Sequence, residues 1–312
     1  MIKLGIVGAG NIGKSHSLAI SQNPDCCLVA VCDTVIERAE EIATCHGAKS
    51  FTDYKEMCAS VEMDAVIINL PHFLHHEVTV YFLEHGVNVL VEKPMAMTAT
   101  ECDSMIAAAE RNGVKLAVGH VQRYFAAYGE VKKLVENGRY GKLCMITDVR
   151  NTNYLQNRPK WFLTKNLSGG GIVMNFGAHS LDKIMYVCGQ RVENAHAILR
   201  NPLSDDDVEI NAQLLLQLTG DISATISFCG CPGVYAHETV FYFENGVAKV
   251  TAGGNKLLVS ENGTFVTAYE GRSTLLADQL CEFVKFLRGE DNMMVTAEYG
   301  REIVSALEKI LS

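Results

Sequence analysis

The chain has 312 residues, about twice the size of a usual domain, and we therefore expect two domains. Apolar residues make up 48% and charged residues 20%, which is globular composition and excludes a disordered or collagen-like chain. With a net charge of −9, the chain lacks the basic surface that binds the phosphate backbone of nucleic acids, so nucleic acid is not an expected partner.

The eleven cysteines show no spacing typical of a zinc site, and we expect no metal site. They are interpreted as reduced, buried thiols of a cytoplasmic protein. The apolar stretches are too short to span a membrane, and the first residues read as a strand and not as a signal peptide, so no membrane partner is expected.

The first 120 residues alternate between apolar runs and helical stretches. Runs of this length without polar alternation are typical of parallel strands covered on both faces. His46-Gly47 and Gly86 indicate where two helices stop, and a capping box of Thr98 and Glu101 indicates where another helix starts. This pattern predicts an α/β fold, a doubly wound parallel sheet in residues 1–120. The expected strands are residues 2–7, 28–32, 65–69, 87–91 and 114–118.

The pattern changes after residue 120, and we place a hinge near residues 119–123. Residues 121–312 are predicted to form an α+β domain on a large, mostly antiparallel open sheet, because Asn-Gly pairs at 245 and 262 indicate hairpins. Expected helices cover residues 126–137, 177–188, 274–288 and 296–311. Expected strands cover residues 192–199, 208–218, 222–229, 238–243, 247–252, 256–260 and 265–269.

A dinucleotide-binding turn is predicted at Gly8-Ala9-Gly10-Asn11-Ile12-Gly13, between a strand and a helix. Gly8 permits the tight turn, Gly10 lets the backbone approach a pyrophosphate, and Gly13 lets the helix pack closely. Asp33 ends the second strand, where a carboxylate binds the ribose hydroxyls. Because that carboxylate repels a 2′-phosphate, we expect NAD in preference to NADP.

Two further clusters are candidates for the reacting centre. Glu92 and Lys93 follow a parallel strand, where open sheets bind ligands, and a partly desolvated lysine can lower the pKa of a substrate hydroxyl. They could equally be an exposed pair at a strand end. Asn175, His179 and Asp182 are spaced to share one helix face, and histidine exchanges protons near neutral pH, although a structural role is also open.

The ordered set of motifs resembles the Gfo/Idh/MocA family, the glucose–fructose oxidoreductase and inositol dehydrogenase group, over nearly the whole chain. The resemblance implies a Rossmann domain, a second domain whose open sheet forms a dimer or tetramer, and NAD(P)-dependent oxidation or reduction of a sugar, polyol or related compound. It is carried by the glycine turn, Asp33, residues 51–54, 64–68 and 71–77, Glu92-Lys93-Pro94, residues 158–162 and the triple glycine followed by Gly177-Ala178-His179.

Residue roles follow from this resemblance. Lys93 matches the catalytic lysine and His179 the catalytic histidine, and a cis Lys93–Pro94 bond is expected. Asn175 replaces an aspartate that could accept a proton, so a strict Asp–His relay is in doubt. The expected cofactor residues include the glycine turn together with Asp33, Glu92 and Lys93. They also include Pro71, His72 and His75. His72 departs from the usual asparagine and could instead fill a polar pocket.

Substrate contacts are expected from segments that border the cleft in relatives. These residues are His120, Arg123, Asn153, Arg158, Trp161 and Asp182. A structural role is favoured for Arg123, and Arg158 either pairs with a carboxylate or phosphate of the substrate or pins its loop. Two alternatives stay open beside the dehydrogenase: a non-catalytic dinucleotide-binding regulator, and a reductase of a non-sugar carbonyl.

Overall fold

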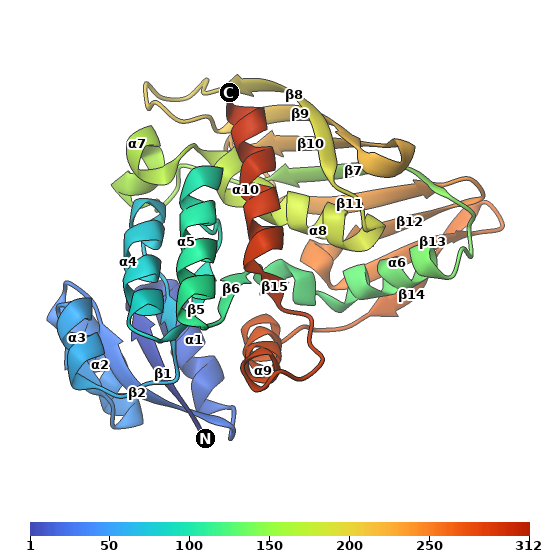
Figure 1. Ribbon diagram of the computed structural model, residues 1–312. Coiled ribbons are helices and arrows are strands. Elements are labelled where there is room, and N and C mark those ends of the chain that lie inside the picture. Colours follow the sequence, from blue (N-terminus) through green and yellow to red (C-terminus); the bar gives the residue numbers. More distant parts are fainter. The chain divides into compact units, whose positions relative to one another are not determined.

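The structure is a computed structural model that describes all 312 residues. The chain forms two compact units, one of Met1–Val121 with Thr274–Val304 and one of Gln122–Ser273 with Ser305–Ser312. The chain therefore passes between the units three times, after residues 121, 273 and 304 (Figure 1). No helix is both long enough and apolar enough to cross a membrane.

The first unit is built on a seven-stranded sheet with the order β15-β6-β5-β4-β1-β2-β3. All neighbours are parallel except β15, which runs antiparallel to β6. The order of the first six strands is that of a Rossmann fold, as predicted. The strands are β1 (Ile2–Val7), β2 (Cys26–Cys32), β3 (Lys49–Phe51), β4 (Ala65–Ile68), β5 (Asn88–Glu92), β6 (Leu116–Gly119) and β15 (Val295–Thr296).

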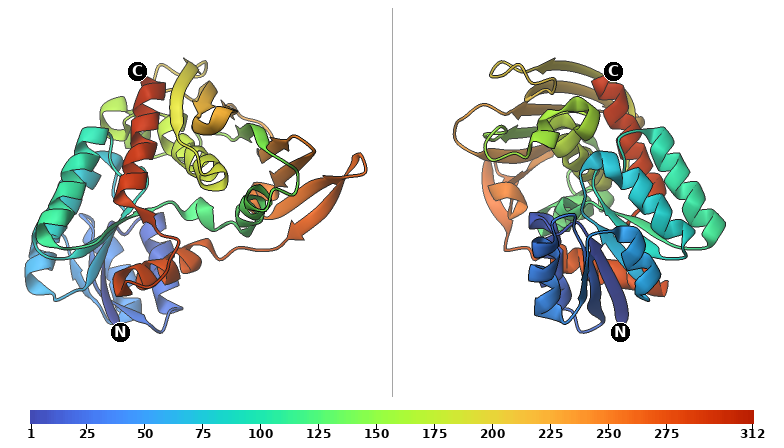
Figure 2. Two further views of the ribbon diagram at one scale, coloured as in Figure 1. Left: turned by 45° about the vertical axis from the view of Figure 1, so that its right-hand side comes forward. Right: turned by 90° about the vertical axis from the view of Figure 1, so that its left-hand side faces the viewer.

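Helices cover both faces of this sheet (Figure 2). One face packs against α1 (Asn11–Ser21), α2 (Ile36–His46) and α9 (Leu275–Arg288). The other face packs against α3 (Tyr54–Ser60), α4 (His72–Glu84), α5 (Ala99–Asn112) and the first part of α10 (Ala297–Leu311). The capping box of Thr98 and Glu101 is present at the start of α5, and Gly113 in a left-handed conformation ends it.

The first unit extends beyond its expected boundary at residue 120. Residues 274–304 were expected in the second domain but lie with the first unit. The reason is packing: Leu280 and Phe283 of α9 are buried in the core beside the sheet, and Val295 pairs with Val118 of β6. Periodicity alone shows that α9 is amphipathic but does not show which sheet receives its apolar face.

The second unit contains an eight-stranded sheet with the order β14-β13-β12-β11-β7-β10-β9-β8. Only β7 and β10 are parallel neighbours, so the sheet is mostly antiparallel, as predicted. The strands are β7 (Leu143–Asn151), β8 (Val192–Arg200), β9 (Asn211–Leu218), β10 (Ile222–Cys229), β11 (Ala236–Phe243), β12 (Gly246–Thr251), β13 (Lys256–Glu261) and β14 (Thr264–Glu270). The expectation omitted β7, which lies among the central strands.

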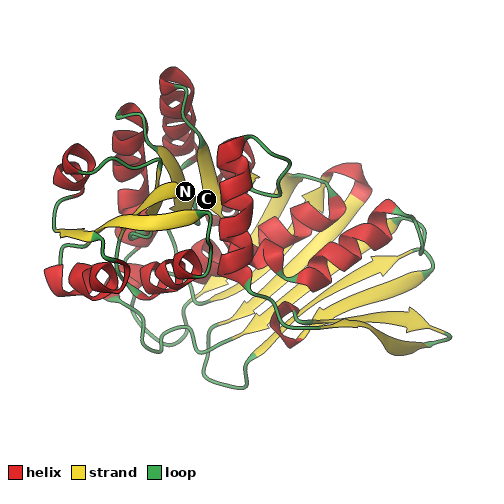
Figure 3. Ribbon diagram, turned by 90° about the horizontal axis from the view of Figure 1, so that it is seen from below, coloured by secondary structure: helices red, strands yellow, loops and turns green.

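Helices α6 (Ala126–Glu136) and α8 (Ala178–Cys188) lie on one face of this sheet (Figure 3). Along β7, Ile146, Asp148 and Arg150 are buried, and the alternate residues Met145 and Val149 are exposed. The two faces of the sheet therefore differ. The side chains of one face are buried in the interior of the unit, and those of the other, open face are exposed.

The cysteines form no disulfide, but they are less buried than expected. Cys26, Cys32, Cys102 and Cys188 are buried, as small apolar side chains in a core usually are. The expectation of buried thiols is wrong for the four exposed ones, Cys45, Cys144, Cys229 and Cys281.

Candidate functional site

The glycine turn joins β1 to α1 in the conformation that its three glycines require. Gly8 has φ +96°, and a Cβ there would lie 2.4 Å from the carbonyl oxygen of Asn69. A Cβ on Gly13 would lie 2.1 Å from the carbonyl oxygen of Gly8. A Cβ on Gly10 would meet no protein atom within 4 Å. Gly10 thus faces open space, where a pyrophosphate could approach the backbone.

The N-terminus of α1 is free to bind an anion. Its N-cap residue, Gly10, has no side chain to accept from the first N–H groups, so these groups of Asn11, Ile12 and Gly13 face outward with the positive end of the helix dipole. Asp33 lies beside the turn because its carboxylate accepts from Ala9 N at 2.8 Å and from Val35 N at 2.9 Å. A carboxylate has further acceptor positions for ribose hydroxyls. These residues fit a dinucleotide.

Asn69, which follows β4, belongs beside this turn but was not predicted. Both polar atoms of its side chain are buried without a hydrogen-bond partner. Its Nδ2 lies 3.7 Å from the position that a Cβ on Gly13 would take. A buried amide with no protein partner is costly, and a bound nucleotide could supply one. The sequence signal was its position at the carboxyl end of a core strand.

Glu92 and Lys93 lie at the end of β5, and a buried histidine holds the carboxylate. His16 of α1 places Nε2 3.0 Å from Oε1 of Glu92, and Oε2 accepts from Lys93 N at 3.3 Å. Burial would raise the pKa of Glu92, but His16 and Lys93 outweigh it and lower the pKa below its usual value. Glu92 is therefore ionised and orients the backbone at Lys93. His16 was missed because histidines in helices have no position-specific signal.

Pro71, His72 and His75 begin α4, and the ring of His75 joins two loops. Its Nδ1 lies 2.8 Å from the carbonyl oxygen of Pro94, and its Nε2 lies 2.8 Å from that of Leu70. Burial lowers the pKa of His75 below its usual value, and the neutral ring has one N–H, so only one of these carbonyl oxygens accepts a hydrogen bond from it. The expected contact between His75 and the cofactor stays a prediction. The adjacent His72 is also buried, and the Lys93–Pro94 bond is cis, as predicted.

Asn175 and His179 lie on either side of a change in helix type. A π-helix covers Val173–Gly177 and α8 starts at Ala178, so the regular helical spacing expected for these residues is interrupted. Such π segments are frequent at functional sites because they re-aim side chains. Both side chains are buried. Partly buried Glu209 fixes the segment by accepting from Gly171 N and Val173 N at 2.9 Å.

The remaining expected substrate residues have varied surroundings. His120 is buried after β6 in the first unit. In the second unit Arg123 and Asp182 form a buried ion pair, with Nη2 of Arg123 2.5 Å from Oδ1 of Asp182. A structural role for Arg123 was favoured, and this ion pair would give Asp182 a structural role too. Asn153 Nδ2 donates to Gln156. The ring of Trp161 stacks on that of Phe162 with centres 3.8 Å apart.

A buried polar network on the inner face of the second sheet was not predicted. Asp148 accepts from Thr239 at 2.5 Å and from Ser180, and Lys183 Nζ lies 3.5 Å from its Oδ1. Lys183 Nζ also lies 2.7 Å from Nε2 of His237. Although burial raises the pKa of Asp148, the Lys183 charge and these hydrogen bonds bring it far below its usual value. The network adds fixed charge to the interior of this unit.

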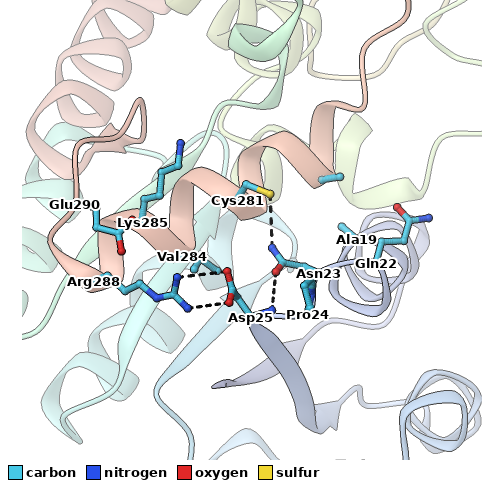
Figure 4. A pocket seen from close by; sticks show the side chains of 11 residues that line it. Ala19, Gln22, Asn23, Pro24, Asp25, Cys281, Val284, Lys285, Arg288 and Glu290 are labelled. Carbon is cyan, nitrogen blue, oxygen red and sulfur yellow. Dashed lines mark hydrogen bonds and ion pairs between the residues drawn. The ribbon is translucent and has the colours of Figure 1, made fainter.

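A surface cavity of about 350 Å³ in the first unit is separate from the glycine turn (Figure 4). It lies between the end of α1 and α9, where Arg288 pairs with Asp25 and Asn23 contacts Cys281. Because α1 has 11 residues, this end is about 16 Å from the anion-binding end. The cavity therefore does not serve the dinucleotide site.

Both units match known families. Residues 2–120 match a family model described as an oxidoreductase family with an NAD-binding Rossmann fold, and residues 128–249 match one described as the GFO/IDH/MocA C-terminal domain. Among solved structures, the WlbA dehydrogenase from Bordetella pertussis, in complex with NADH and UDP-GlcNAcA, is 25% identical. Its TM-score is 0.87, with 99% of this chain and 95% of that chain covered.

Two curated relatives illustrate the similarity. D-glucoside 3-dehydrogenase from Escherichia coli (strain K12) is 33% identical over 205 residues, covering 63% of this chain and 57% of the relative. Inositol 2-dehydrogenase from Rhizobium meliloti is 28% identical over 230 residues, covering 72% and 68%. For several curated relatives the match spans only 48% to 59% of their length. The chain belongs to the Gfo/Idh/MocA family of oxidoreductases, which has an NAD-binding Rossmann fold.

Proposed function

We propose that this protein transfers a hydride between a nicotinamide cofactor and a sugar, a polyol or a related alcohol or carbonyl. The observation that carries the proposal is the open glycine turn, where Gly10 faces free space at the uncapped N-terminus of α1 and Asp33 lies alongside. Membership of an NAD-binding oxidoreductase family supports it, as do relatives named for sugar and inositol dehydrogenation.

NAD is proposed as the preferred cofactor. The carboxylate of Asp33 is held toward the turn by two backbone N–H groups, so it suits ribose hydroxyls and repels a 2′-phosphate. The comparison of kcat/KM for NAD and for NADP tests this preference. A higher value for NADP would contradict it.

The chemical roles are assigned to three side chains. The bound nicotinamide supplies the hydride chemistry, and the protein supplies orientation and charge. In the oxidation direction His179 accepts the proton of the substrate hydroxyl, and Lys93 stabilises the developing alkoxide. Asn175 cannot accept a proton and positions a neighbouring hydroxyl instead. Either Lys93 or His179 can be the final proton carrier.

The experiment is a panel of polyols, aldoses and inositols with NAD, followed at the absorbance band of the reduced nicotinamide. Reduction of NAD by any of them supports the proposal. NAD binding measured by calorimetry is the control for a folded cofactor site. Tight NAD binding together with no turnover on the panel, in either direction, would contradict the enzymatic role.

A second candidate is a dinucleotide-binding regulator without catalysis. The observation that favours it is Asn175, which removes a proton acceptor next to His179. A third, a reductase of a non-sugar carbonyl, is favoured by the stacked Trp161 and Phe162. Adding aromatic dihydrodiols to the panel separates this candidate from the sugar dehydrogenase.

The second unit is proposed to bind the substrate and to join copies of the chain as a homodimer or homotetramer. The open face of its sheet exposes Met145 and Val149 of β7, Leu215 of β9 and Ile198 of β8, which point the same way in the strand register. Exposed apolar side chains gathered on one face are typical of protein–protein contacts.

A further inference from the structure

Two arginines of the second unit lie against the same aromatic ring. The Cζ atom of Arg150 is 4.4 Å from the centre of the Phe176 ring, and that of Arg158 is 5.4 Å from it. Arg158 also lies 4.5 Å from the ring centre of Tyr154 and donates from Nε to the carbonyl oxygen of Tyr154 at 3.0 Å. Stacking of this kind orients a planar guanidinium and leaves its outer N–H groups available.

Neither of these guanidinium groups has a carboxylate within ion-pair distance, although Arg150 is buried and Arg158 is partly buried. Arg150 is 3% exposed, and its Nε is buried without a hydrogen-bond partner. Its Nη2 donates to Gln122 Oε1 at 3.2 Å and lies 3.0 Å from Nδ1 of His237, both uncharged groups. A buried cation without a counter-ion is unfavourable, so this arrangement is typical of a site that receives an anion.

The neighbouring carboxylates are already engaged by other groups. The carboxylate nearest in the network, Asp148, is already shared by Thr239, Ser180 and Lys183. Burial lowers the pKa of Lys183 to about 8. The charge of Arg150 also lowers this pKa, whereas that of Asp148 raises it. Two further carboxylates of this unit are also engaged, because Asp182 pairs with Arg123 and Glu209 accepts from Gly171 N and Val173 N. Arg150 and Arg158 are thus left without a counter-ion.

We propose that Arg150 and Arg158 bind an anionic group of the substrate, which is therefore a sugar or polyol that carries a carboxylate or a phosphate. A guanidinium matches the oxygens of either group with two parallel hydrogen bonds. Phe176 lies in the same π-helix as Asn175, and this places the anion site next to a residue of the candidate active site. The inference rests on the proposed function, since it names the class of substrate.

The single tryptophan provides a direct binding signal. Trp161 stacks on Phe162, and Arg158 lies 5.2 Å from the ring centre of Phe162. We therefore propose titrating the NAD-saturated protein with glucuronate, with glucose 6-phosphate and with glucose while following tryptophan fluorescence. At least one of the two anions is expected to bind about 10- to 100-fold more tightly than glucose. The anion that binds more tightly identifies carboxylate or phosphate as the group.

Variants assign the effect to the arginines. Arg158→Gln is expected to lower affinity for the preferred anion about 10- to 100-fold and to leave affinity for glucose unchanged. Arg158→Lys keeps the charge but not the paired hydrogen bonds, so it should recover part of the loss. Arg150→Gln should act in the same way. Arg272→Gln, at an exposed arginine of the same unit, is the control and should change nothing.

Two outcomes would overturn the anion site. One is equal affinity for glucose and both anions, and the other is an equal loss for glucose and anions in Arg158→Gln. Because Arg150 is buried and its removal could unfold the protein, the Arg158 variants decide the matter. The proposed function fails separately: anion-selective binding with no reduction of NAD rejects the dehydrogenase and keeps the site, whereas turnover of neutral polyols alone rejects the site and keeps the dehydrogenase.

Discussion

At the scale of the residue, substitutions at Gly10 and Gly13 should distinguish an effect on cofactor binding from an effect on folding. A Cβ on Gly13 would collide with the backbone carbonyl of Gly8, which cannot rotate away, whereas a Cβ on Gly10 would meet no protein atom. Gly13→Ala should therefore destabilise the protein by about 1–3 kcal/mol and weaken NAD binding.

Gly10→Ala is the matched variant of this pair. It should leave the melting temperature unchanged and lower NAD affinity at least about tenfold, because the new methyl group enters the space of the pyrophosphate. Calorimetric titration and thermal unfolding of both variants provide the measurement. Unchanged NAD affinity in Gly10→Ala would place the nucleotide elsewhere.

Lys93 and His179 are expected to act in turnover and not in cofactor binding. Because general acid–base assistance contributes about 10²- to 10⁴-fold in rate, Lys93→Ala and His179→Ala should each lower kcat by that factor. NAD affinity should persist in both variants. A variant that turns over the best substrate of the panel at nearly the normal rate would remove its residue from the mechanism.

At the scale of the element, β7, β11 and α8 share the buried polar network. Burial first, and then the charge of Lys183, lowers the pKa of His237 to about 4 from the model-compound value of 6.5. Between these two pH values the unfolded chain binds the proton that the folded chain excludes, so acid favours unfolding. The free energy of unfolding should therefore fall as the pH is lowered from 6.5 toward 4, by at most roughly 3 kcal/mol.

His237→Asn tests this assignment, since the variant cannot take up that proton. Its urea unfolding free energy should vary less between pH 6.5 and 4 than that of the unaltered protein. His196→Asn, at an exposed histidine of β8, is the control and should keep the full dependence. An equal pH dependence in all three proteins would show that His237 does not titrate on unfolding.

At the scale of the whole molecule, we expect copies of the chain to join through the open face of the second sheet. Leu215 is 52% exposed on this face, and a second copy is expected to cover it. Leu215→Glu should shift the protein from dimer or tetramer to monomer in sedimentation analysis, because a buried unpaired carboxylate opposes association. Met293→Glu, at an exposed apolar residue of the first unit, should not change the mass. A monomeric unaltered protein would contradict the assembly.

The two kinds of sheet and most helices of this molecule followed from local patterns, whereas the strand orders and the short strands β3 and β15 did not. The capping box at Thr98 and the buried runs of the first sheet were correctly predicted because their signals lie within a few residues of each other. The central strand β7 was missed because its apolar run ends at Ile146, and the next buried positions carry the charged residues Asp148 and Arg150. The placement of α9 was missed because an amphipathic helix does not specify its partner.

Sequence alone determined the doubly wound parallel sheet, the glycine turn with Asp33 and the family, because each depends on short spacings that the backbone must obey. Only the tertiary structure decided that the ring of His75 lies between the carbonyl oxygens of Leu70 and Pro94 and that His16 contacts Glu92. It also decided that Arg150 and Arg158 lie against Phe176 without a carboxylate. These contacts join residues that are distant in sequence or separated by a loop. Their energies depend on burial and on neighbouring charges, which no local pattern records.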